Sequence, residues 1–238
     1  MGRAGEVSRR RVNAAPPRVD PRRLRLVVIT DAALAAPRDL LDVVERALRA
    51  GAPAVQLRDK HLGSGDLLAL AKKLRALTAE YEALFFVNDR VDVALLAGAD
   101  GAHLGPDDLP VSAARRKVPS GFLLGASTDD PDLARALVAD GADYIGCGAV
   151  WATGSKADAG DVIGLAGLER VVRAVSVPVI GIGGITPERA DEVAAVGAGI
   201  AVIGAVMGAP DPGAAVRALL APFRSGRTLR ACTDPTAA

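Results

Sequence analysis

The feature that most constrains the fold is a repeat of short apolar runs, each followed by a stretch with helical spacing rich in alanine and leucine. This alternation is typical of parallel βα units, and we count eight of them. The strands are expected at Leu24–Thr30, Ala54–Arg58, Leu84–Asn88, Gly101–Leu104, Leu123–Ser127, Tyr144–Gly148, Val179–Gly183 and Ile200–Gly204. The helices are expected near 39–50, 65–81, 90–98, 111–116, 131–140, 165–174, 187–196 and 212–221.

Eight parallel strands favour closure into a single (β/α)8 barrel, an α/β fold that leaves no sheet edge open. A doubly wound sheet is the alternative, but no Gly-x-Gly-x-x-Gly follows the first strand. Helix starts support the alternation, since Ser64, Asp130 and Thr186 suit N-cap positions, with Pro131 and Pro187 next to two of them.

Charge is distributed unevenly along the 238 residues. Residues 1–23 carry seven arginines and predict a basic disordered leader, followed by the barrel over 24–223 and a tail over 224–238. The remainder has 22 basic and 26 acidic residues, which argues against nucleic acid as the main partner, although the leader alone could contact RNA.

The composition also bears on cellular location. No run approaches the ~20 apolar residues of a membrane helix, and no apolar stretch follows the basic leader. Two cysteines are too few for a disulfide framework or a cysteine metal site. We therefore expect a cytoplasmic enzyme with no membrane partner. A homodimer stays open from the sequence.

Active sites of such barrels lie at the carboxyl ends of the strands, so polar residues there are candidates. Gln56, Arg58 and Lys60 fall on one face of the second strand and its extension, which makes that face cationic. A diphosphate would pair these charges. The plainer alternative is an internal salt bridge with a surface lysine.

Carboxylates end the next two strands: Asn88-Asp89 closes the third, and Asp107-Asp108 follows the fourth. Magnesium is usually held by one or two carboxylates plus substrate phosphates, so Asp89 and Asp108 could share Mg2+. For either aspartate alone, a helix N-cap is the plainer interpretation.

Two further segments suit phosphate oxygens. The loop from Ala149 to about Gly164 carries Thr153, Ser155 and Lys156, and its length favours a lid over a plain surface loop. The seventh and eighth strands end in Gly181–Gly184 and Ile203-Gly204, where many barrels bind phosphate through backbone N–H groups. Packing is the alternative role for these glycines.

Other reactive side chains have simpler expected roles. His103 lies in the middle of the fourth strand and is expected to be a hydrogen-bonded core histidine. Cys147 is expected to pack as a small apolar residue, and Trp151 to pack the lid or shield a ring.

Taken together and in order, these motifs resemble the thiamine-phosphate synthase family over about residues 24–222: VQLRDK, FFVNDRVDVAL, GADGAHLGPDDLPV, LGASTDDP, GADYIGCGAVWATGSK, PVIGIGGITPE and AVIGAVMGAPDP. The resemblance implies a transferase of thiamine biosynthesis on a barrel fold. Such an enzyme joins 4-amino-2-methyl-5-(diphosphooxymethyl)pyrimidine to thiazole phosphate, in its plain or carboxylated form. The products are thiamine phosphate and diphosphate.

The resemblance also implies roles for residues. Gln56, Arg58, Lys60 and Asn88 would contact the pyrimidine diphosphate, Asp89 and Asp108 would bind Mg2+, and Ser127 and Lys156 would hold the departing diphosphate. Thr153, Ser155, Gly184, Ile203 and Gly204 would hold the thiazole phosphate. In this family diphosphate leaves first, and the thiazole nitrogen then attacks the pyrimidine methylene cation.

This chain departs from the family pattern mainly on the thiazole side. Gly204 stands in place of a serine, Pro106 in place of a polar residue, and Ala149, Ala152 and Gly154 where prolines are common in the lid. Two alternatives therefore stay open: a thiazole tautomerase on the same barrel, and a non-catalytic phosphate-ligand sensor. Release of diphosphate would distinguish all three.

Overall fold

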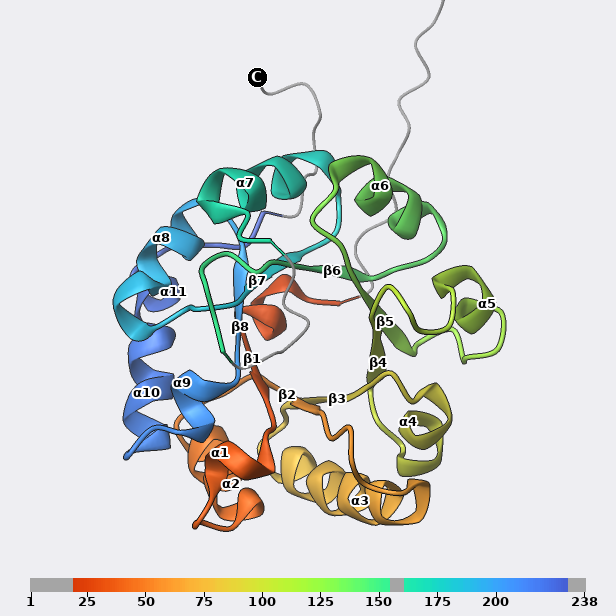
Figure 1. Ribbon diagram of the computed structural model, residues 1–238, viewed down its shortest axis with the longest axis vertical. Helices are drawn as coiled ribbons and strands as arrows, with labels where there is room; N and C mark the ends of the chain where they lie inside the picture. Colours follow the sequence, from red (N-terminus) through yellow and green to blue (C-terminus); the bar gives the residue numbers. More distant parts are fainter. Residues whose placement is uncertain (1–18, 155–160, 231–238) are drawn as a thin grey trace, which may run out of the picture.

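The computed structural model describes residues 19–154 and 161–230. Eight parallel strands follow one another in chain order around a closed barrel, and β8 pairs with β1 (Figure 1). The predicted α/β barrel is therefore confirmed. The strands are β1 (Leu26–Ile29), β2 (Ala54–Leu57), β3 (Leu84–Asn88), β4 (Gly101–Leu104), β5 (Leu123–Ser127), β6 (Tyr144–Cys147), β7 (Val179–Ile182) and β8 (Gly199–Val202).

Helices surround the barrel, as Figure 1 shows. Those predicted from the sequence are α2 (Leu40–Arg49), α3 (Ser64–Glu80), α4 (Val91–Ala97), α5 (Val111–Arg115), α6 (Pro131–Ala139), α7 (Gly164–Ala174), α8 (Ala190–Ala195) and α10 (Pro212–Leu219). The short helices η1 (Pro21–Leu24), α1 (Ala32–Ala35), η2 (Pro187–Arg189), α9 (Gly204–Met207) and α11 (Ala221–Arg224) add single turns, which are too short to show a helical period in the sequence.

Helix starts agree with the sequence in part. Asp130 caps α6 by accepting hydrogen bonds from the N–H groups of Asp132 and Leu133. Ser64 is not an N-cap: it is the first helical residue of α3, and its hydroxyl accepts a hydrogen bond from Arg90 instead. Thr186 precedes η2 without a side-chain cap bond.

The barrel interior is packed by side chains that need glycines beside them. A Cβ on Gly125 would lie 2.1 Å from the ring carbon Cζ of Tyr144 and 2.5 Å from Nδ1 of His103. A Cβ on Gly146 would lie 2.9 Å from the His103 ring. Small residues on β5 and β6 thus leave room for two large polar rings inside the barrel.

The amino ends of the strands are tied by buried or half-buried carboxylates. Asp100 accepts a hydrogen bond from the Phe85 N–H at 2.8 Å, and Asp143 accepts one from the Leu124 N–H at 2.8 Å. Asp143 also pairs with Arg115 at 2.5 Å. This end of a barrel contributes to stability, which leaves the opposite end for chemistry.

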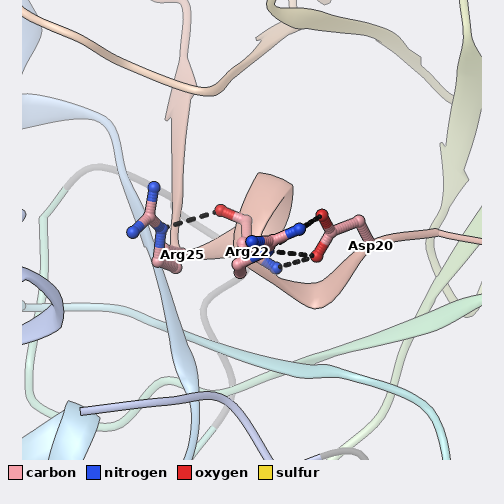
Figure 2. A network of polar contacts seen from close by, with 3 residues as sticks. All are labelled: Asp20, Arg22 and Arg25. Carbon is pink, nitrogen blue, oxygen red and sulfur yellow. Dashed lines mark hydrogen bonds and ion pairs between the residues drawn. The ribbon is translucent and has the colours of Figure 1, made fainter. Parts of the chain in front are cut away.

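The chain entering β1 is also packed. Val19 is buried, and Asp20 caps η1 while holding the Arg22 guanidinium at 2.8 Å; Arg25 donates to the Arg22 carbonyl (Figure 2). At the other end Leu229 is buried. Packed residues therefore extend past the expected boundaries at 24 and 223, because both flanks cover apolar surface at the barrel's edge.

None of the helices within 19–154 and 161–230 is long and apolar enough to cross a membrane.

Candidate active site

A cavity of about 630 Å3 opens where the carboxyl ends of the strands meet. Most residues predicted from the sequence line it: Arg58, Lys60, Asn88, Asp89, Asp108, Ser127, Thr153, Gly184, Ile203 and Gly204. Gln56 is buried and is not among the lining residues. Ser155 and Lys156 lie outside the described residues. The structure thus brings together side chains from both halves of the barrel.

Arg58 and Lys60 follow β2 and form the positively charged part of the cavity lining, here called the cationic wall. Its backbone is hydrogen-bonded to Thr30, the residue after β1. The N–H of Arg58 donates to the hydroxyl of Thr30 at 2.9 Å, and that hydroxyl donates to the Arg58 carbonyl at 3.2 Å. Thr30 is almost fully buried. It fixes the backbone from which Arg58 and then Lys60 reach the cavity, a role the sequence does not indicate.

The acidic pair lies beside this wall. Asp89 has a left-handed backbone, with φ of 63°, and its N–H donates to the His103 carbonyl at 2.9 Å. Asp108 is oriented by the Gly105 N–H, which donates to its carboxylate at 2.6 Å. A non-glycine residue with positive φ is uncommon, and such strain concentrates at functional sites.

Electrostatics at the pair are unfavourable for two bare carboxylates. Burial raises the pKa of Asp89 to about 6, and a hydrogen bond and charge repulsion from Asp108 act in the same direction. The positive charges of Lys60 and Arg58 oppose this rise of the Asp89 pKa without cancelling it. A cation between the two carboxylates would relieve this repulsion.

The donor set fits magnesium. Asp89 and Asp108 present hard carboxylate oxygens, the type of donor that Mg2+ prefers. The described part of the chain has no cluster of three or more histidine, cysteine, aspartate or glutamate residues that could hold a metal by itself. Asp89 and Asp108 alone would leave most of the coordination shell to water and to phosphate oxygens of a substrate. This is the usual way in which proteins hold Mg2+.

A chain of hydrogen bonds crosses the barrel interior behind Ser127. Its Oγ lies 2.8 Å from Nε2 of His103, whose Nδ1 lies 3.1 Å from the Tyr144 hydroxyl. Gln56 hydrogen-bonds the same hydroxyl through its side chain. His103 is hydrogen-bonded as predicted, but it is only partly buried and lines the cavity, so its expected place in the core is wrong. Gln56 lies behind the cavity wall, in contact with Tyr144.

The β7 turn requires glycine. Gly183 and Gly184 have φ of 98° and 62°, in the left-handed region that glycine adopts without steric cost. A Cβ on Gly184 would also lie 2.7 Å from the Ala152 carbonyl oxygen. After β8, Gly204 begins α9, so its N–H belongs to the helix start that has no intrahelical partner.

One contact at the carboxyl end of the barrel could not be predicted from any local pattern in the sequence. Arg189 donates to the Gly184 carbonyl at 2.7 Å, and its guanidinium carbon lies 4.9 Å from the centre of a Trp151 ring. Trp151 lies in the loop after β6 and Arg189 ends η2 after β7, and the barrel brings these two segments together.

Comparisons with known proteins bear on the family to which this chain belongs. A family model described as thiamine monophosphate synthase matches residues 26–206. The thiamine-phosphate synthase of Methanoculleus marisnigri is 50% identical over 195 residues, covering 82% of this chain and 92% of that protein. The thiamine-phosphate synthase of Moorella thermoacetica is 47% identical over 195 residues, covering 82% of this chain and 93% of that protein.

A solved structure is also similar. Thiamine phosphate pyrophosphorylase from Pyrococcus furiosus superposes with a TM-score of 0.79 at 44% identity, covering 85% of this chain and 96% of that chain. A 3-hexulose-6-phosphate synthase superposes with a TM-score of 0.61 at 21% identity and shares the fold. The resemblance found in the sequence is confirmed: the chain belongs to the thiamine monophosphate synthase family.

Proposed function

We propose that this chain joins a pyrimidine carrying a diphosphooxymethyl group to thiazole phosphate, forming thiamine phosphate and releasing diphosphate. The observation that carries the proposal is one cavity with two anion-binding sides. Cations and carboxylates from β2 to β5 form one side, and the glycine turns after β7 and β8 form the other. Two phosphorylated substrates fit such a cavity with their reacting carbon and nitrogen between them.

The diphosphate occupies the first side. Arg58 and Lys60 supply positive charge, Asn88 and Ser127 supply polar hydrogen-bonding groups, and Lys156 joins them on the basis of the sequence. Hydrogen bonds from ionised donors to phosphate oxygens are about twice as strong as neutral ones. They strengthen further as charge builds on the leaving group.

Ser127 would be directed by the residues behind it. If Tyr144 donates to Nδ1 of His103, then Nε2 carries the proton and donates to Ser127, whose own hydroxyl hydrogen is left for the diphosphate. The reverse direction would leave Ser127 only lone pairs to offer to an anion. A bound diphosphate therefore favours the first arrangement.

Asp89 and Asp108 would hold Mg2+. When bound, the ion would neutralise charge on the diphosphate and make it a better leaving group. The two carboxylates orient the ion next to the cationic wall, since the charges of Arg58 and Lys60 already act on Asp89.

Thiazole phosphate occupies the second side. The backbone N–H groups at Gly184, Ile203 and Gly204 suit phosphate oxygens, with Thr153 and Ser155 adding hydroxyls from the loop after β6. The carbon–oxygen bond to diphosphate breaks with its electron pair leaving on diphosphate. The lone pair of the thiazole nitrogen then forms the new carbon–nitrogen bond.

The direct test is release of diphosphate by the purified chain. We expect release only with both substrates and Mg2+, and its loss in Arg58→Gln. A tautomerase would isomerise the thiazole without releasing diphosphate, and a sensor would bind phosphate ligands without turnover. Either result would overturn the proposal. From the sequence we also propose a cytoplasmic enzyme.

A further inference from the structure

The loop after β6 is joined to the glycine turn after β7. The N–H of Val150 donates to the Ile182 carbonyl at 2.8 Å, and the N–H of Trp151 donates to the Gly183 carbonyl at 3.0 Å. Gly184 packs so closely on this segment that a Cβ there would lie 2.7 Å from Cβ of Trp151. Trp151 therefore lies directly on the turn.

Arg189 bridges these two parts from the start of the following helix. Its Nη1 donates to the Gly184 carbonyl at 2.7 Å, while the guanidinium lies 4.9 Å from the centre of the Trp151 ring. Within 19–154 and 161–230, no carboxylate forms a salt bridge with Arg189. The carbonyl and the ring are therefore its observed partners in the described structure.

The carbonyl contact has a consequence for the cavity. In a trans peptide the C=O and the N–H point in opposite directions, so holding the Gly184 carbonyl also fixes the N–H of Ile185. Both residues line the cavity. Arg189, which is not among the lining residues, thus fixes the orientation of a peptide at the cavity wall.

We infer that Arg189 is a positioning residue that couples Trp151, in the loop after β6, to the phosphate-binding turn at Gly184, and so sets the affinity for thiazole phosphate. The inference rests on the proposed function. A planar guanidinium stacks on an aromatic ring and forks toward an acceptor in one plane, whereas a lysine ammonium is a point charge. Lysine should replace the carbonyl contact but not the stacking.

The kinetic test compares Arg189→Met with Arg173→Met. Arg173 is an exposed arginine on α7 paired with Glu169 at 2.6 Å, a kind of surface pair that contributes little. We expect Arg189→Met to raise KM for thiazole phosphate by about tenfold, the effect of misplacing one backbone N–H that donates to the phosphate, with KM for the pyrimidine diphosphate and kcat nearly unchanged. Arg189→Lys should be intermediate, and Arg173→Met should match the wild type.

Trp151 is the single tryptophan of the chain, so tryptophan fluorescence reports on the surroundings of this residue alone. Thiazole phosphate should change the emission of the wild type, and the change should be absent from Arg189→Met at saturating ligand. Trp151→Leu, which keeps the arginine but removes the ring, should show the same selective rise in KM. It serves as a second variant if Arg189→Met folds poorly.

The outcomes distinguish the coupling through Arg189 from the proposed function. An unchanged KM for thiazole phosphate in an active Arg189→Met enzyme, or an equal rise in both KM values, would overturn the coupling and leave the proposed function intact. A wild-type chain that neither binds thiazole phosphate nor releases diphosphate would overturn both.

Discussion

Replacing Asp89 with asparagine should stabilise the metal-free protein while lowering its activity. Burial, with Asp108 as a second cause, raises the pKa of Asp89 from 3.8 to about 6. Because the raised pKa favours the protonated form in the folded state, the stability it contributes is present below the unfolded value and is lost as pH rises through about 6. At neutral and alkaline pH the ionised carboxylate therefore costs stability.

The magnitude follows from the size of the shift. Each pKa unit corresponds to about 1.4 kcal/mol, so the shift sets an upper limit of about 3 kcal/mol. Asp89 is only half-buried, and solvent screening reduces the net cost to about 1 kcal/mol. Asparagine is neutral, nearly isosteric and tolerant of the positive φ at this position. Asp89→Asn should then raise Tm by about 2–4 °C in a protein of this size.

The assay is thermal unfolding in the presence of a chelator at about pH 5 and about pH 8, a range that spans the raised pKa of Asp89. The difference in Tm between wild type and Asp89→Asn should increase as pH rises. Mg2+ with inorganic diphosphate should reduce this difference, because it should stabilise the wild type more than the variant. Asp92→Asn is the matched control, because hydrogen bonds from Arg90 lower the pKa of Asp92. Neutralising Asp92 should slightly destabilise the protein.

Two results would refute this reasoning. A lower Tm for Asp89→Asn than for wild type at alkaline pH would show that the ionised carboxylate is already compensated within the fold. Full diphosphate release by Asp89→Asn in chelator would show that this residue holds no metal needed for turnover.

Three further predictions concern single positions. Gly204→Ser adds a hydroxyl donor at the first residue of α9, a helical position, so thiazole phosphate should bind about tenfold more tightly by calorimetric titration. Unchanged affinity would contradict this. Lys156→Ala should lower kcat more than thiazole affinity in steady-state kinetics, and a loss confined to thiazole KM would reassign this lysine. In a Cys232→Ser protein, Cys147 should resist a thiol reagent until denaturant is added, because burial raises the pKa of its thiol to about 12. Rapid labelling of Cys147 in the folded protein would contradict its burial.

Agreement between sequence and structure is closest for the strands. Those predicted at Leu84–Asn88, Gly101–Leu104 and Leu123–Ser127 have the same limits in β3, β4 and β5. One predicted helix over 212–221 is instead two, α10 and α11, because Pro222 has no N–H to continue the hydrogen bonding of α10. Single turns such as α1 and α9 are too short for any period to mark them.

The candidate site could likewise be predicted only in part from the sequence. Polar residues at strand ends, such as Arg58, Asp89 and Asp108, could be predicted because every parallel strand of a closed barrel ends at one rim. The placement of Gln56 behind the cavity could not be predicted, because its side chain is hydrogen-bonded to Tyr144 from β6. The predicted roles of Ser155 and Lys156 rest on the sequence alone.

By itself the sequence determined the barrel, its strands and the chemical type of each strand end, because apolar period and turn residues act over a few neighbouring positions. Only the tertiary structure decided which of those ends face one another. The Ser127–His103 contact and the Arg189 bridge to Trp151 each join segments far apart in the chain. The raised pKa of Asp89 likewise depends on burial and on a carboxylate from another strand end. Such effects arise from distances in space, which no local pattern of residues encodes.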